Sequence, residues 1–217
     1  MNVNKDPWSA ATHFLGFLAA VVGLVCLVIP ATHSASKLTA MALYGGSLVT
    51  LFLASSVYHF FDLGPRGNRW LKRLDHSAIF VLIAGSYMPP VFHLLDGAMR
   101  ITMLAVIGGI ATVGVLVKLV WIDAPTWLSM SLYLALGWIV LIPIAWMLPR
   151  MAPSSLALLV TGGLAYTVGA VVYAKRWPDP WPETFGHHEV WHLFVLGGAA
   201  LHYGCMFTLL EAPVPAF

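Results

Sequence analysis

The chain has 217 residues, of which 59% are hydrophobic and only 9% are charged. An ordinary soluble domain has roughly 25% charged residues, so the charged side chains here are too few to cover a surface that faces water. This composition excludes a soluble globular protein and indicates an integral membrane protein. A net charge of +2 without a basic stripe also excludes nucleic-acid binding.

Apolar segments bounded by charged residues, prolines or polar clusters predict seven spanning helices. They cover residues 13–30, 38–61, 75–95, 101–121, 127–148, 154–174 and 188–210. Each is close to the roughly 20 residues that a spanning helix needs, and their continuous apolar character disfavours the alternating strands of a β-barrel. The connections are too short for a soluble domain, so we expect one all-α, seven-transmembrane helix bundle over residues 1–217.

The distribution of lysine and arginine predicts the orientation, because positively charged loops stay in the cytoplasm. With a cytoplasmic N-terminus, the basic residues on the cytoplasmic side are Lys5, Arg66, Arg69, Lys72, Arg73, Lys118, Lys175 and Arg176. Those on the outer side are Lys37, Arg100 and Arg150. The sequence therefore predicts a cytoplasmic N-terminus and a C-terminus outside.

Histidines and a carboxylate share one predicted depth in the membrane. His59 lies at the cytoplasmic end of the second span, Asp75 opens the third, and His188 and His192 open the seventh. Ionisable side chains at membrane depth are energetically costly, which makes them candidates for a functional site. The charge count predicts their common depth, whereas their lateral adjacency stays open.

The spacing of these residues is typical of a metal site. His188 and His192 are four residues apart, which places both rings on one helix face. His59 supplies a third ligand most naturally, because catalytic zinc usually has three protein ligands and a water. Ser55 precedes His59 by one helical turn, and Asp75 can hold the water or orient a ligand. We therefore predict zinc, bound by the three histidines, with Asp75 and Ser55 as catalytic residues.

Packing interpretations of the same residues stay open. In these, Asp75 pairs with Arg73 or caps the third helix, and Ser55 bonds back to its own helix. His187 and His76 are then neighbours of the site rather than ligands. Isolated membrane histidines are most often helix-packing hydrogen-bond donors, the role expected for His13, His33, His93 and His202.

Residues 188–192 also form an HExxH pattern, in which Glu189 would be the general base of a metalloprotease. In the alternative interpretation, Glu189 is an acidic residue of the first helical turn, which the helix dipole favours.

Three ordered motifs carry a family resemblance that extends over almost the whole chain. Residues 55–59 match an SxxxH motif, residues 74–77 (Leu-Asp-His-Ser) match the aspartate motif that follows it, and residues 188–192 match a terminal HxxxH. The opening segment 6–16 looks like the start of the same family. The chain resembles the progestin and adipoQ receptor family, specifically its bacterial hemolysin-III-type branch of seven-helix membrane proteins.

The resemblance implies a zinc ion held by His59, His188 and His192 near the cytoplasmic face, with Asp75 and Ser55 around its water. The family is also similar to alkaline ceramidases, so hydrolysis of a ceramide-like lipid amide is the leading predicted activity. Because the family pattern is HxxxH, Glu189 is at most an assistant in this chemistry.

Other functions stay open beside the hydrolase. One is a receptor-like or membrane-homeostasis protein that regulates membrane fluidity and uses zinc structurally. Another is an intramembrane metalloprotease built on HExxH, and a cytolysin is the least supported. Membrane lipids are the expected partners, and the bacterial match predicts the bacterial cytoplasmic membrane. The oligomeric state and the substrate stay open.

Overall fold

The computed structural model describes residues 5–210, and the regular secondary structure in this range is helical. The long helices are α1 (Pro7–Ala31), α2 (Ala35–Phe60), α3 (Gly64–Leu94), α4 (Gly97–Val120), α5 (Thr126–Trp138), α7 (Pro153–Lys175) and α8 (His187–Thr208). Between α5 and α7 lie the short helices η1 (Ile139–Leu141), α6 (Ile144–Met147) and η2 (Leu148–Arg150). The predicted all-α membrane bundle is confirmed in this range. The outer ends of the predicted domain, residues 1–4 and 211–217, lie outside the described residues.

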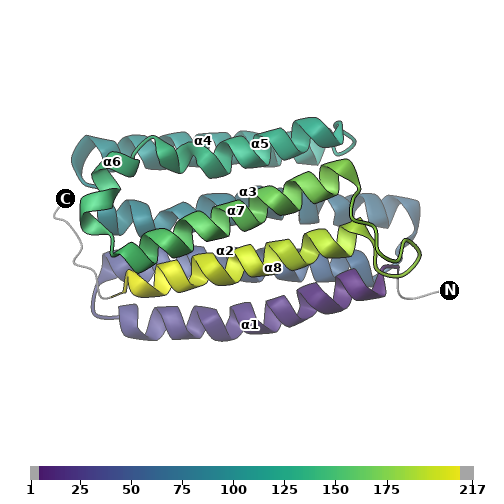
Figure 1. The fold of residues 1–217 in the computed structure, drawn as a ribbon, viewed down its shortest axis with the longest axis horizontal. Helices are drawn as coiled ribbons and strands as arrows, with labels where there is room; N and C mark the ends of the chain where they lie inside the picture. The colour runs from purple at the N-terminus through teal and green to yellow at the C-terminus, as the bar shows by residue number, and fades with distance from the viewer. Residues whose placement is uncertain (1–4, 211–217) are drawn as a thin grey trace.

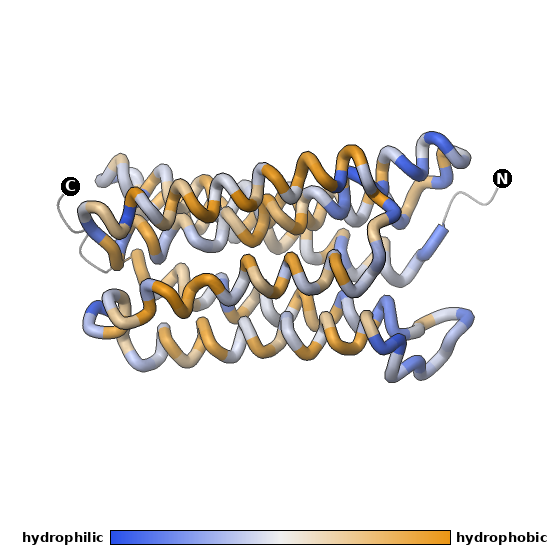
Figure 2. Tube along the Cα trace, turned by 90° about the horizontal axis from the view of Figure 1, so that it is seen from above, coloured by the Kyte–Doolittle hydropathy of each residue, from blue (hydrophilic) through white to orange (hydrophobic). Residues whose placement is uncertain are grey.

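The helices run up and down along one long axis (Figure 1). Consecutive long helices pack against each other, and α8 returns to lie against α1. The start of α1 and the end of α8 lie at opposite ends of the bundle, as an odd number of crossings requires. Figure 2 shows the hydrophilic residues gathered at the two ends, so the apolar middle matches a membrane core. Which end faces the cytoplasm stays a prediction.

Helix bounds differ from the predicted spans where a helix continues beyond its apolar part. Helix α3 begins at Gly64, whereas the predicted span begins at residue 75. Likewise α1 begins at Pro7, ahead of the predicted residue 13. Hydropathy marks only the part of a helix that faces lipid, but backbone hydrogen bonding continues into water. The basic segment 66–73 is therefore a helical extension of α3, not a loop.

The predicted span 127–148 is not one continuous helix. Within residues 5–210, six helices are long and apolar enough to cross a membrane, and a seventh span results if the pair Thr126–Leu141 and Ile144–Arg150 counts as one. This pair is bent by 44°. Pro143 lies at the break, where its ring and missing N–H interrupt the helical hydrogen bonds.

Candidate metal centre

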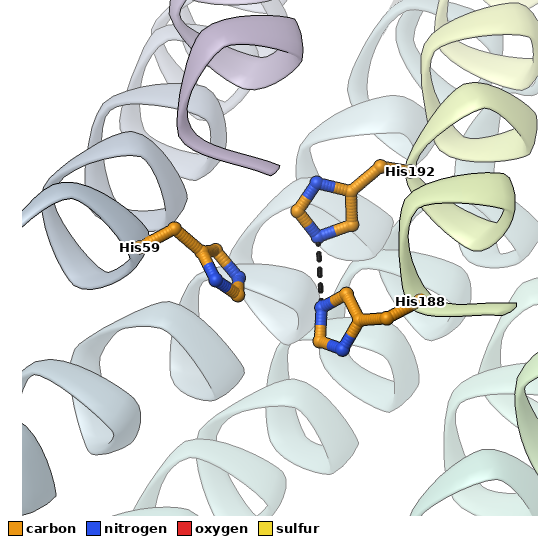
Figure 3. Close-up of side chains that lie close together, drawn as sticks. All are labelled: His59, His188 and His192. Atoms are coloured by element: carbon orange, nitrogen blue, oxygen red, sulfur yellow. Dashed lines mark hydrogen bonds between the residues drawn. The ribbon is translucent and has the colours of Figure 1, made fainter. Parts of the chain in front are cut away.

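Three histidines converge at one end of the bundle (Figure 3). His59 comes from the last turn of α2, and His188 and His192 come from the first two turns of α8. One nitrogen of each lies within 4.8 Å of the others. His59 and His192 are buried and His188 is half-buried, so the cluster is closed on most sides. The tertiary structure thus brings together three residues that the sequence places only at one depth.

The spacing of the nitrogens fits a small metal ion. The Nε2 atoms of His188 and His192 are 3.1 Å apart. Two nitrogens bound tetrahedrally at 2.0–2.1 Å from one ion lie about 3.3 Å apart, so the two rings already have nearly the required separation. The His59 ring meets both others edge-on, with centroids 5.0 Å from His188 and 4.9 Å from His192. A set of three imidazoles can hold a metal ion here.

Asp6 fixes the orientation of His59. The Nδ1 of His59 donates to Asp6 Oδ2 at 2.9 Å, and the backbone N–H of Asp6 donates to the His59 carbonyl at 3.0 Å. The hydrogen bond from His59 holds the pKa of the Asp6 carboxyl below its usual value. Because Nδ1 is protonated, Nε2 keeps its lone pair free to bind a metal, the arrangement seen in many metal-ligating histidines. Sequence reasoning missed this role, although Asp6 precedes the first span at the depth of His59.

Ser55 reaches the cluster through His13. Ser55 Oγ and His13 Nδ1 share a hydrogen bond of 2.7 Å, and both side chains are buried. The His13 ring stacks on His192 with 3.6 Å between centroids and 10° between planes. The expected helix-packing role of His13 is correct, since it joins α1 to α2. Its contact with His192 also makes it part of the site, which the sequence did not indicate.

Asp75 is buried in the middle of α3 rather than at its start. The alternative that it caps this helix is therefore wrong, because the helix begins eleven residues earlier at Gly64. His76 Nδ1 donates to Asp75 Oδ2 at 3.0 Å. The guanidinium of Arg73, the other partner considered, lies 4.7 Å from the centroid of the Trp70 ring.

Glu189 uses its carboxylate to hold the start of α8. Its Oε2 accepts from the backbone N–H of Gly186 at 2.9 Å, and its Oε1 accepts from Ser9 Oγ at 2.7 Å. The residue therefore caps the first backbone N–H of α8, as the acidic residue of a capping box does, and joins α8 to α1. Both oxygens are engaged in structural bonds, which favours the first-turn interpretation over the general base of a protease.

The remaining histidines lie apart from the cluster. His187 donates to Asp179 in the loop before α8, at 3.2 Å. His202 donates to the Leu159 carbonyl of α7 at 3.1 Å, as expected of a helix-packing residue. His93 instead donates to the Pro89 carbonyl of its own helix at 2.7 Å. His33 differs from the expectation. It is exposed in the turn between α1 and α2 and therefore lies outside the packed helices.

A cavity of about 230 Å³ leads from the cluster into the bundle. At the cluster end its wall includes polar side chains of four helices: His13, Ser55, Asp75, His188 and His192. Most of the remaining lining is apolar and comes from α3, α5, α7 and α8. Leu141 and Val160 line the cavity and are also 57% and 42% exposed, so the cavity opens sideways between η1 and α7, at membrane depth.

These features define a class of protein: a multi-pass helical membrane protein with a buried histidine cluster at one end of its bundle. The chain belongs to the haemolysin-III related family, whose model matches residues 1–203. This confirms the family resemblance predicted from the three motifs.

Similar proteins extend from bacteria to animals. The chain is 32% identical to the hemolysin-3 homolog of Bacillus subtilis over 97% of both chains. It is also 32% identical to hemolysin-3 of Bacillus cereus, over 94% of this chain and 91% of that protein. The adiponectin receptor protein of Drosophila melanogaster is 26% identical over 93% of this chain and 50% of its own length.

Proposed function

We propose that the protein is a zinc-dependent membrane hydrolase that cleaves a lipid amide of the ceramide type. One observation carries the proposal: a single cavity connects the histidine cluster and Asp75 with an apolar interior that opens sideways toward lipid. A lipid can enter such a cavity from the membrane and present its amide to the polar end.

Zinc suits the donor set on chemical grounds. Three neutral imidazoles with space for a fourth ligand match the usual catalytic zinc site. His59, His188 and His192 would hold the ion, and Asp6 supports His59 from behind. When bound, zinc supplies Lewis-acid polarisation of a carbonyl and a nucleophilic water near neutral pH.

The chain's own residues then guide the proton transfers. Asp75 lies at the polar end of the cavity and can take a proton from the attacking water. The water oxygen bonds to the carbonyl carbon, the carbon–nitrogen bond breaks, and Asp75 returns the proton to the departing amine. Ser55, held by His13, orients the water by hydrogen bonding.

The test combines metal content with turnover in detergent-purified protein. We expect close to one zinc ion per chain, and loss of zinc in His59→Ala, His188→Ala and His192→Ala. Asp75→Ala should keep zinc but lose hydrolysis of a fluorescent ceramide analogue, and the exposed His33→Ala serves as the unaffected control. Protein without zinc, or full turnover in Asp75→Ala, would overturn the proposal.

A receptor-like or membrane-homeostasis role is the second candidate, because the relatives include a protein named as an adiponectin receptor. In that function the zinc is structural, and Asp75→Ala preserves the signalling or membrane-regulating activity.

The hydrogen bonds made by the Glu189 carboxylate disfavour the metalloprotease. Two bacterial relatives support the bacterial cytoplasmic membrane as the location, with membrane lipids as partners.

A further inference from the structure

A second polar group lines the cavity far from the histidine cluster. It consists of Tyr44 from α2, Tyr166 from α7 and His202 from α8, and we call it the inner polar group. The Tyr166 and His202 rings contact each other edge-on, with centroids 5.3 Å apart. Tyr44 lines the same cavity as these two rings. Three helices thus contribute polar side chains to this part of a mainly apolar wall.

Two helices give the same separation between this group and the cluster. His202 follows His192 by ten residues on α8, which corresponds to about 15 Å of helical rise. Tyr44 precedes Ser55 by eleven residues on α2, which corresponds to about 16 Å. Both pairs line the one cavity. An extended molecule whose reacting group lies at the cluster therefore reaches the inner polar group with its chain.

Hydrogen bonding distinguishes the Tyr44 hydroxyl from those of Tyr87 and Thr167 in the same wall. The Tyr44 side chain is 1% exposed, and its hydroxyl has no hydrogen-bond partner among the described residues. The Tyr87 hydroxyl donates to the carbonyl of Gly137 at 2.6 Å, and Thr167 Oγ1 donates to that of Gly163 at 2.7 Å. A buried hydroxyl without a hydrogen-bond partner destabilises a protein. A ligand oxygen in the cavity that bonds to the Tyr44 hydroxyl would remove this cost.

The two other members are held rigidly. His202 Nε2 donates to the Leu159 carbonyl at 3.1 Å, which leaves Nδ1 as an acceptor. Glycines lie directly against both rings: a Cβ on Gly162 would overlap the His202 ring, and one on Gly198 would lie 2.9 Å from the Tyr166 ring. Close packing of α7 on α8 therefore fixes the donors and acceptors before any ligand arrives, which lowers the entropic cost of binding.

We infer that the inner polar group is a second binding subsite, which accepts a hydroxyl or carbonyl oxygen on the hydrophobic chain of the ligand. That oxygen lies about 15 Å from the group bound at the histidine cluster. The inference rests on the proposed function, because it assumes that the acyl chain lies in this cavity. It adds a substrate class: lipids whose chain carries an internal oxygen function.

The test measures the affinity of acids that correspond to the acyl product of the proposed hydrolysis. Octadecanoic acid and its hydroxy derivatives, with the hydroxyl at successive chain positions, are titrated into detergent-purified protein. We expect the isomer whose hydroxyl lies about 15 Å from the carboxylate to bind about two- to tenfold more tightly than octadecanoic acid, the range for one hydrogen bond. Tyr44→Phe should remove this preference and leave the affinity for octadecanoic acid unchanged.

Tyr203→Phe is the matched control, because the Tyr203 hydroxyl donates to the Gly23 carbonyl and does not line the cavity. This variant should keep the preference. Tyr166→Phe provides a second variant on another helix and should weaken it. Equal affinities along the series, or a preference retained in Tyr44→Phe, would overturn the subsite while leaving the hydrolase intact. Failure of every acid to bind would overturn both proposals.

Discussion

Single hydrogen bonds decide what each polar residue of the site can do. His59 donates from Nδ1 to Asp6, so its free nitrogen is the one that faces the other two histidines. Glu189 has the sequence position of a metalloprotease base, but its oxygens accept from Gly186 and Ser9. Residue type and spacing are therefore insufficient to assign roles, and the partner of each atom is needed.

Replacing Asp6 by asparagine should weaken zinc binding about 10- to 100-fold, because the carboxylate that orients His59 and raises its basicity is lost. The measurement is a zinc titration of the purified variant against a competing chelator. Asp179→Asn is the control, since Asp179 bonds His187 outside the cluster. Unchanged zinc affinity in Asp6→Asn would show that the bond to His59 does not support a ligand.

Glu189→Gln should keep zinc and reduce lipid-amide turnover by less than about tenfold, whereas loss of a general base costs about 10²- to 10⁴-fold. The same variant should melt at a lower temperature, because a weakened helix cap costs about 1 kcal/mol. Turnover and melting are measured on one preparation. A stable variant without activity would favour the protease instead.

At the scale of elements, small residues set how closely the helices approach. Gly114 of α4 faces Phe80 of α3, and a Cβ at that position would overlap the Phe80 ring. Phe80 is 1% exposed and its ring also packs on Tyr133, so it has little space to move. The bend at Pro143 has the opposite effect to these close contacts. It interrupts the fifth span beside Leu141, where the cavity opens.

Gly114→Ala should destabilise the protein by about 1–3 kcal/mol, the usual cost of overpacking a filled core. Gly109→Ala on the same helix has open space around the new methyl group and should be neutral or stabilising by up to about 1 kcal/mol, because alanine favours helix. The two melting temperatures in detergent are compared. Equal shifts would contradict the close contact between α3 and α4.

At the scale of the whole molecule, the charged residues follow the ends of the bundle. The basic extension of α3 and the ends of α4 and α7 lie at the end that holds the histidine cluster. Six tryptophans at the same end are each more than half exposed, as interfacial anchors are: Trp8, Trp70, Trp121, Trp127, Trp177 and Trp181. This distribution supports the predicted orientation, with the cluster toward the cytoplasm.

The orientation predicts the behaviour of reporter fusions in a bacterial host. A fluorescent protein that matures only in the cytoplasm should be bright when fused to the N-terminus and dark when fused to the C-terminus. An alkaline phosphatase, which is active only outside the cytoplasm, should give the opposite pattern. Reversal of both patterns would place the histidine cluster at the outer face.

The span limits show what hydropathy can and cannot predict. The seven apolar segments correspond to the helices, but the charged start of α3 and the break at Pro143 change their lengths and shapes. Hydropathy responds to lipid contact, whereas helix limits depend on backbone hydrogen bonds and on local breakers. A proline inside an apolar segment is visible in the sequence and signals such a break.

The sequence by itself determined the class of protein, the helical fold and the common depth of the polar residues. These follow from composition, from the helical repeat and from the order of spans along the chain. Only the tertiary structure decided which side chains meet: that His59 joins His188 and His192, that Asp6 and His13 support them, and that one cavity continues to the inner polar group. Lateral neighbours depend on how helices distant in sequence pack together, and no local pattern contains that information.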